Sequence, residues 1–222
     1  MNNSKELSQT ISTQSNLYAV IKTMGTMELY QKDEIIYFEG DTADKFFLIK
    51  SGRVRLFLSS IEGNELSLAI LGENTVFGES SYFGNSPRLT SVSALTDVEL
   101  FSVDFNMLMT SFTDNPNLMM EMFALMARRI HSLAAQVYSM NFFSADKKVA
   151  HILVHLGTNF KREKSGSYSI DYTHEDISSL IGTARTTTTK ILKIFEQKGW
   201  ISLAYKKIIV LDEVSLKEYF LT

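Results

Sequence analysis

The most informative part of this chain is residues 173–198, which read THEDISSLIGTARTTTTKILKIFEQK. Thr173 and Asp176 resemble a capping box, in which a hydroxyl and a carboxylate three residues later bond each other's backbone N–H groups. Gly182 then predicts the end of a helix of about two turns, because glycine readily adopts the left-handed conformation that closes many helices. A second helix is expected from about Ala184 to Lys198.

The second of these helices is expected to have two chemically different faces. Helical spacing predicts a buried face made of Thr188, Ile191, Leu192 and Phe195. The opposite face carries basic and hydroxyl side chains, namely Arg185, Thr186, Thr189, Lys190 and Lys193. Two short helices joined by a tight glycine turn, the second with such a face, describe a helix-turn-helix.

Four consecutive threonines, residues 186–189, begin this second helix. Threonine is a mediocre helix former because its branched Cβ loses rotamer freedom, so the run needs another explanation. Hydroxyls that bond phosphates or base edges, and methyls that contact thymine, supply one. The alternative is a strand, which the helix signals on both sides disfavour. We assign DNA contact on this helix to Arg185, Thr186, Thr187, Thr189 and Lys190.

A basic hairpin is expected after the helix-turn-helix. Ile201–Ala204 and Ile208–Leu211 would pair around Tyr205, Lys206 and Lys207, which makes Lys206 a further DNA contact at the tip of a wing. Residues 144–222 carry 12 Lys and Arg against 9 Asp and Glu, whereas residues 1–143 carry 10 against 16. A basic segment in an acidic chain indicates a polyanionic partner, here double-stranded DNA, although a solvated lysine face explains the charge alone about equally well.

In the first half of the chain, the apolar residues recur with a different period. From Met27 to Val103, short runs that alternate apolar and polar residues are separated by glycines, at positions 40, 52, 63 and 72. Alternation with period two at this turn spacing predicts an antiparallel sandwich or barrel, in which each strand turns one face to a core.

A long helix is predicted between these two regions. Asp114-Asn115-Pro116 is a helix-start signal, and a heptad stripe follows it, made of Met126, Ile130, Leu133, Val137 and Met140. Such a seam favours a coiled-coil homodimer, the alternative being the central helix of a monomer. The fold class is therefore α+β, with a β-roll or jelly-roll sensor domain over 1–113, a dimerisation helix over 114–141 and a winged helix-turn-helix over 142–222.

Composition and motifs exclude several classes of function. The chain has no cysteine, which excludes disulfides, Cys-ligated zinc, iron–sulfur clusters and thiol switches. It has no apolar run of about 18 residues, and residues 1–15 lack the apolar core of a signal peptide, so we expect a cytoplasmic protein without a membrane partner. No enzyme motif is present. His151 and His155 have the spacing of a metal pair and His131 offers one haem ligand, but solvated histidines are favoured and we predict no metal.

Three stretches, in this order, resemble the CRP/FNR family of bacterial transcription regulators. Residues 77–80 with Pro87 and Arg88 are similar to the family's phosphate-binding cassette, and residues 126–130 to its dimerisation helix. The segment from Asp176 to Leu203 is close to its helix-turn-helix signature. The resemblance implies a jelly-roll-like sensor domain, a homodimer on a pseudo-palindromic operator, a small-molecule effector and contact with RNA polymerase.

The resemblance also implies an effector site, formed by Gly78, Glu79, Ser80, Arg88, Leu133 and Ala134. Leu89 stands where the family has Ser or Thr, and Leu133 and Ala134 replace the two hydroxyl residues that touch the purine in cAMP-responsive members. We therefore expect an effector other than cAMP, such as an acidic organic molecule with an apolar body. The alternatives are a structural ion pair between Glu79 and Arg88, and a vestigial sensor barrel in a regulator that is constitutive or controlled by a protein partner.

Overall fold

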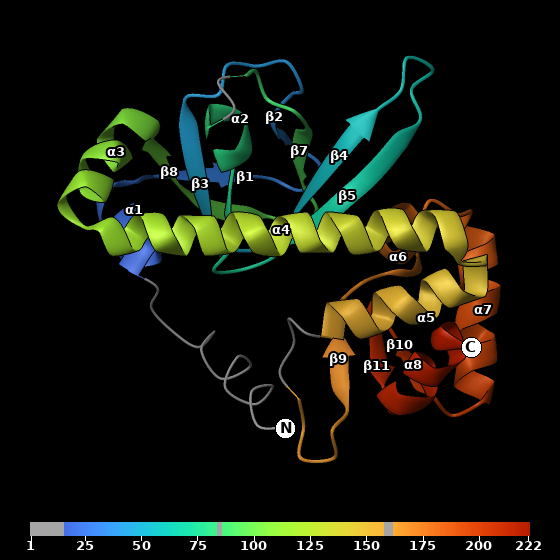
Figure 1. The fold of residues 1–222 in the computed structure, drawn as a ribbon. Coiled ribbons are helices and arrows are strands. Elements are labelled where there is room, and N and C mark those ends of the chain that lie inside the picture. Colours follow the sequence, from blue (N-terminus) through green and yellow to red (C-terminus); the bar gives the residue numbers. More distant parts are fainter. Residues whose placement is uncertain (1–15, 84–85, 158–161) are drawn as a thin grey trace. The chain divides into compact units, whose positions relative to one another are not determined.

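The structure is a computed structural model that describes residues 16–83, 86–157 and 162–222 (Figure 1). Residues 1–15, for which the sequence predicts no signal peptide, lie outside this range. The chain divides into two compact units, one formed by Met1–Phe57 and Ile70–Arg129 and the other by Leu58–Ala69 and Ile130–Thr222. Within the described residues, no helix is both long enough and apolar enough to cross a membrane.

Two four-stranded sheets dominate the N-terminal half. Their strand orders are β1-β8-β3-β6 and β2-β7-β4-β5. The strands are β1 Thr26–Tyr30, β2 Ile35–Tyr37, β3 Lys45–Ser51, β4 Val54–Ser59, β5 Glu65–Leu71, β6 Val76–Phe77, β7 Ser91–Ala94 and β8 Val98–Asp104. Strand β8 pairs antiparallel with both β1 and β3, and β7 pairs antiparallel with both β2 and β4. The predicted antiparallel sandwich of short strands is confirmed.

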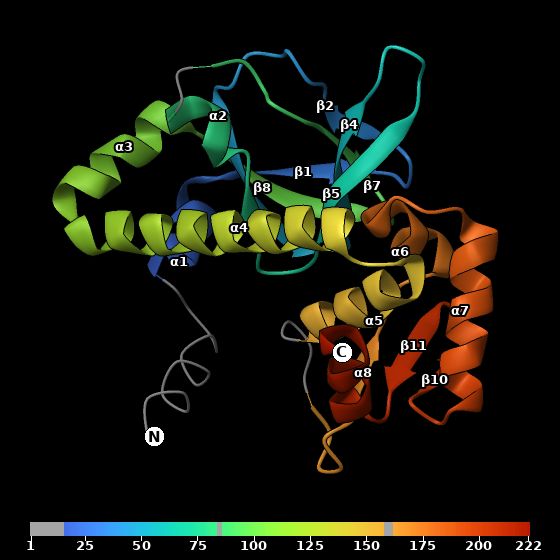
Figure 2. The same cartoon turned by 45° about the vertical axis from the view of Figure 1, so that its right-hand side comes forward.

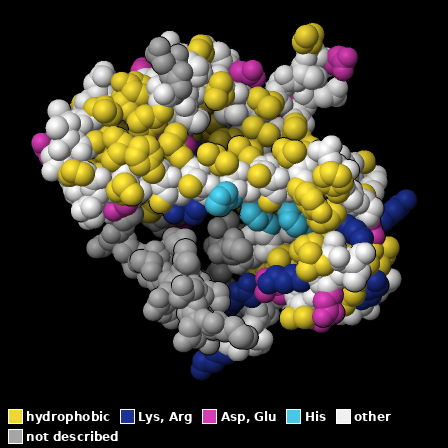
Figure 3. Space-filling view, in the orientation of Figure 1, with side chains coloured by type: hydrophobic (Ala, Val, Ile, Leu, Met, Phe, Trp, Pro, Cys, Tyr) yellow, Lys and Arg dark blue, Asp and Glu magenta, His cyan; other side chains and the backbone are white. Residues whose placement is uncertain are grey.

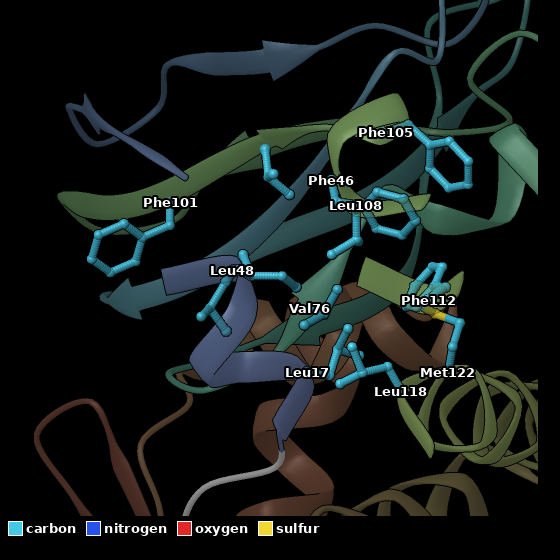
Figure 4. Packing of buried hydrophobic residues seen from close by; sticks show 12 residues of the cluster. Leu17, Phe46, Leu48, Val76, Phe101, Phe105, Leu108, Phe112, Leu118 and Met122 are labelled. Carbon is cyan, nitrogen blue, oxygen red and sulfur yellow. The ribbon is translucent and has the colours of Figure 1, made fainter. Parts of the chain in front are cut away.

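Strand β3 is buried on both faces and organises the core of the first unit. Phe47 and Ile49 join a cluster that includes residues of the second sheet, such as Val54 and Val92. Their neighbours Phe46 and Leu48 point to the opposite side, because successive strand residues alternate. That side is covered by helices α1 (Asn16–Met24), α3 (Phe105–Asp114) and the start of α4 (Figure 4). The short helix α2 (Glu79–Phe83) packs against this core through Tyr82 and carries part of the predicted effector site.

Helix α4 spans Pro116–Phe142 and begins where the sequence predicts, with the N–H of Asn117 bonded to Asn115 Oδ1 at 3.2 Å. Leu118 and Met122 are buried in the core of the first unit. Among the predicted dimer-seam residues, Ile130, Leu133 and Val137 are exposed. Met126 packs partly against the core of its own chain, and Met140 is half-buried.

Among its described residues, the second unit contains four further helices and a small sheet (Figure 2). The helices are α5 Ala145–Leu156, α6 His174–Ile181, α7 Arg185–Gln197 and α8 Glu213–Leu221. The sheet has the order β10-β11-β9, with β9 at Tyr168–Ile170, β10 at Ile201–Ala204 and β11 at Lys207–Val210. The two helices and the closing hairpin that the sequence predicts are confirmed, with boundaries within two residues of those expected.

Candidate DNA-binding surface and effector site

The turn between α6 and α7 is fixed by local hydrogen bonds that the sequence predicts. Thr173 Oγ1 accepts a bond from the N–H of Asp176 at 3.1 Å, and Asp176 Oδ2 accepts one from the N–H of Thr173 at 2.8 Å. Both halves of the capping box are thus present. Gly182 ends α6 with φ of +64°, a left-handed conformation that side chains rarely adopt. These constraints set the direction in which α7 leaves the turn.

Helix α7 buries the predicted face, which consists of Thr188, Ile191, Leu192 and Phe195. Thr188 is fully buried, and its hydroxyl lies 2.9 Å from that of Thr183. One threonine of the run of four therefore serves the interior. A buried hydroxyl without a partner is costly, and this contact removes that cost.

The opposite face of α7 brings four of the predicted DNA contacts onto one exposed surface, formed by Arg185, Thr186, Thr187 and Lys190. Arg185 Nε lies 3.5 Å from Glu175 Oε2, and both side chains are about two-thirds exposed. An ion pair in water at this separation contributes little to stability, so it does not hold the guanidinium away from the predicted DNA contact.

Thr189, the fifth predicted contact on α7, is half-buried against a histidine. His174 Nδ1 lies 3.1 Å from Thr189 Oγ1. Burial lowers the pKa of His174, and the nearby cations Arg185 and Lys193 lower it further, whereas Glu196 opposes them. The sequence gives no sign of this contact, because it joins the first residue of α6 to the middle of α7.

The hairpin of β10 and β11 presents Lys206 at its tip, as predicted. Lys206 is exposed with φ of +53°, and its ammonium lies 5.4 Å from the centroid of the Tyr205 ring. Lys207 pairs with Asp171 instead, at 3.2 Å. Lys206 thus has the exposed tip position from which the sequence predicts a phosphate contact.

The predicted effector site contains two buried charged groups, Glu79 and Arg88. Arg88 donates from Nη1 to the carbonyl of Gly78 at 2.6 Å and from Nη2 to that of Lys45 at 2.8 Å. Its guanidinium also lies over the Tyr37 ring, 4.4 Å from the centroid. The ion pair of Glu79 in the structure is with Arg129 and not with Arg88, whose two terminal nitrogens each donate to a carbonyl group.

The ion-pair partner of Glu79 is Arg129, on α4. Arg129 Nη1 donates to Glu79 Oε1, and its Nη2 donates to the carbonyl of Val76. The sequence analysis missed Arg129 as a site residue. A signal was present, since Arg129 follows Met122 and Leu125 on the inward-facing stripe of α4, where an arginine needs an anionic partner.

Two buried atoms of this site have no hydrogen-bond partner among the described residues: Glu79 Oε2 and Arg88 Nε. Such an atom costs about 1–3 kcal/mol. The carboxylate oxygen accepts a hydrogen bond and the guanidinium Nε donates one, so a donor group would satisfy the first atom and an anionic or carbonyl oxygen the second. Gly78 is required for this close packing: its φ is +91°, and an added Cβ would lie 3.0 Å from Arg88 Nη1.

The other predicted effector residues are placed differently. Ser80 is exposed on α2, and Leu89, which follows Arg88, is also exposed. Leu133 and Ala134 belong to the second unit and are exposed on α4. Their contact with an effector stays a prediction.

His151 and His155 are half-buried, which corrects the expectation that they are solvated. His151 packs against the rings of Phe143 and Phe220, and His155 Nε2 lies 3.0 Å from Ser132 Oγ. Burial lowers the pKa of both histidines. Within the described parts of the chain, no group of three or more His, Asp or Glu side chains is arranged to hold a metal ion.

Comparison with known proteins agrees with this architecture. Residues 27–113 match the cyclic nucleotide-binding domain, and residues 147–219 match the Crp-like helix-turn-helix domain. The chain is 30% identical over 198 residues to the global nitrogen regulator of Nostoc sp., covering 87% of this chain and 89% of that protein. It is 29% identical over 189 residues to the CRP-like cAMP-activated global transcriptional regulator of Mycobacterium tuberculosis, covering 84% of each.

Solved structures show the same fold. FixK2 from Bradyrhizobium japonicum matches with a TM-score of 0.78 and 19% identity, over 87% of this chain and 96% of that one. A CooA mutant from Carboxydothermus hydrogenoformans matches with a TM-score of 0.75 and 22% identity, over 99% of this chain and 96% of that one.

A β-sheet domain with a nucleotide-binding signature, followed by a long helix and a basic winged helix-turn-helix, defines a DNA-binding transcription regulator. Its relatives are transcription regulators as well. More narrowly, this chain belongs to the CRP/FNR family of transcription regulators, as its sequence motifs predict.

Proposed function

We propose that this protein is a homodimeric, sequence-specific transcription regulator whose affinity for DNA is controlled by a small anionic effector other than cAMP. The observation that carries the effector proposal is the pair of unsatisfied buried atoms, Glu79 Oε2 and Arg88 Nε, in a domain that matches a nucleotide-binding model. The protein works in the cytoplasm, has no enzymatic activity or resident cofactor, and acts on RNA polymerase from its operator.

An anionic effector fits the charges around the site. Two guanidinium groups belong to the site: that of Arg129 pairs with the Glu79 carboxylate, and that of Arg88 bonds the carbonyl of the adjacent Gly78. Guanidinium groups bind carboxylates and phosphates in a planar, two-pronged geometry. Leu133 and Ala134 offer no side-chain hydrogen bond to a purine edge, so an acidic organic molecule with an apolar body suits this chain better than cAMP. One relative is named as cAMP-activated and another as a nitrogen regulator, so the names do not decide between cAMP and another acidic molecule as the effector.

The homodimer proposal rests on an exposed apolar row along α4. Phe123, Ile130 and Val137 recur at intervals of seven residues and are all exposed, with Ala127 and Ala134 at the intervening heptad positions. Figure 3 shows hydrophobic side chains gathered along this helix. Apolar residues at spacings of four and three form a coiled-coil seam, which a second copy of α4 would bury. The dimer would present two α7 helices, so the operator is a pseudo-palindrome with half-sites about one DNA turn apart.

A vestigial sensor is the alternative function, and one observation favours it. Arg129 already neutralises Glu79 and bonds the Val76 carbonyl, so the protein closes part of the site with its own side chain. Such a regulator would be constitutive or would respond to a protein partner. A thermal-shift screen of small acids separates the two functions, because a ligand that binds the native state raises the melting temperature by mass action.

The experiment that tests the proposal is selection of bound duplexes from a random pool, with and without a low-molecular-mass cell extract. We expect a pseudo-palindromic sequence whose recovery rises with the extract. Recovery of sequences without a common motif would reject sequence-specific binding, and equal recovery in both arms would support the vestigial sensor.

Calorimetry then examines the effector. Low-micromolar binding of cAMP or cGMP would overturn the proposal of another anion. For any acid that raises the melting temperature, Arg129→Lys should reduce the shift, because lysine keeps the charge but loses the planar fork. Arg128→Lys is the matched control, since Arg128 is exposed on the same turn of α4.

A further inference from the structure

His174 lies within the predicted DNA-binding surface, although the DNA contacts assigned above do not include it. It is the first residue of α6, is half-buried, and shares a hydrogen bond with Thr189 of α7 across 3.1 Å. The exposed α7 residues Arg185 and Lys193 lie close enough to His174 to act on its charge. In a helix-turn-helix the first helix crosses the DNA backbone while the second enters the major groove, so this contact joins the two parts of the interface.

The protonation state of the His174 imidazole determines whether Thr189 can donate a hydrogen bond to DNA or only accept one. A threonine hydroxyl has one proton and two lone pairs. The neutral ring can accept the Thr189 proton at Nδ1, which leaves only lone pairs directed away from the histidine. The imidazolium must donate its Nδ1 proton to Thr189 Oγ1, and the hydroxyl proton is then free to reach an acceptor on a base or phosphate. Protonation of His174 therefore favours Thr189 as a donor.

Burial and the charges around His174 favour its neutral form in the free protein, and the same charges would change when DNA binds. Arg185, Lys193 and Glu196 face it from α7, and Glu175 and Asp176 follow it on α6. Burial is the largest cause that lowers the pKa of His174, and the two cations add to it. A DNA phosphate that approaches these cations supplies negative charge close to the imidazole, which favours the protonated ring.

We propose that His174 couples proton uptake to operator binding and, through Thr189, sets whether the recognition helix presents a hydrogen-bond donor or an acceptor to the DNA. The inference rests on the proposed contact of α7 with DNA. It adds a specificity-determining residue, His174, which lies on the first helix of the motif and contacts the second.

Fluorescence anisotropy with a short duplex, recovered by selection with the wild-type protein, measures the proton linkage between about pH 5 and pH 8. Affinity should rise as the pH falls, by up to tenfold per pH unit for each histidine that takes up a proton, hence up to about 100-fold for a dimer. His174→Asn, which keeps a polar group but does not titrate, should bind with a much flatter pH profile. His131→Asn, at an exposed position on α4, is the matched control and should keep the wild-type slope.

A second readout separates base recognition from a general charge effect. Duplex selection at the two ends of the pH range should shift the preferred base at one position of each half-site for the wild type. Thr189→Val, which removes the hydroxyl but keeps the shape, should keep the pH slope and lose the shift in base preference. Failure of the wild type to bind any duplex would reject the proposed function itself. Specific binding that is independent of pH, or a slope that persists in His174→Asn, would overturn this inference alone.

Discussion

Replacing Arg129 with Gln should destabilise the first unit by about 3 kcal/mol. The Glu79 side chain is 1% exposed, and Arg129, which is 25% exposed, is its ion-pair partner. Removing one partner of a buried pair costs about 3–5 kcal/mol, because the other charge stays buried without compensation. The partial exposure of Arg129 places the expected loss at the lower end of that range.

A double-mutant cycle measured by urea denaturation checks this reasoning. Arg129→Gln and Glu79→Gln are each expected to destabilise the protein, and the combined variant should be more stable than Arg129→Gln alone because it holds no uncompensated charge. The interaction energy between the two changes should exceed about 1 kcal/mol, whereas independent sites add within about 0.5 kcal/mol. Strict additivity, or an equal loss in the exposed control Arg128→Gln, would refute the argument.

Four other outcomes are expected. Gly157→Ala should lower the melting temperature in circular dichroism, because the added Cβ would overlap the buried ring of Tyr168. The expected loss of stability is about 1–3 kcal/mol or more. Gly72→Ala, where the added Cβ meets open space, should leave the melting temperature unchanged. Ile130→Asp should give monomers in sedimentation at micromolar concentration, where the wild type is dimeric, because a charge cannot be buried in an apolar seam without a large cost. Arg185→Ala should weaken operator binding by about 1–3 kcal/mol and relax specificity at one base pair, and an unchanged base-scan would contradict its role in base reading. Burial lowers the pKa of His155, so the unfolded chain takes up a proton at a higher pH than the folded protein does. Stability should therefore fall as the pH drops below about 6.5. His155→Gln should show less of this loss in urea titrations across that pH range.

The helix-turn-helix was predictable because its determinants are local. The capping pair Thr173 and Asp176 is three residues apart, and Gly182 acts on its own turn. Each signal depends on backbone geometry within one or two turns, and the period of the apolar residues then selects the buried face of α7. Tertiary packing needs only to agree with these preferences, so sequence and structure coincide here almost residue by residue.

Which face of α4 is buried within its own chain was harder to predict, because the helix has two apolar stripes. One stripe, including Leu118 and Met122, packs on the core of the first unit, and the other, including Phe123 and Ile130, is exposed. Both stripes have helical spacing, so periodicity alone does not separate them. The seam predicted from Met126 to Met140 combined exposed positions with positions that pack against the same chain.

Polar contacts between distant elements were invisible in the sequence. Glu79 and Arg129 are 50 residues apart, and His174 and Thr189 are 15 apart on different helices. No local pattern encodes either pair, since each depends on how two folded elements are placed. A charged residue on an apolar stripe, as at Arg129, indicates that a partner exists but does not identify it.

The position of Arg129 gives the proposed regulator a direct route from effector to dimer. Arg129 points toward Glu79, while Ile130, the next residue, is exposed on the proposed seam, and the boundary between the two compact units falls between them. Neighbouring side chains on an α-helix point about 100° apart, because a turn contains 3.6 residues. Under the proposed function, an anion that draws Arg129 away from Glu79 would change a charge pair whose loss alone costs several kcal/mol. A local rotation of α4 at Arg129 would also turn its neighbour Ile130. In a dimer built on this seam, the effector would act on the relative placement of the two α4 helices without a contact of its own to DNA.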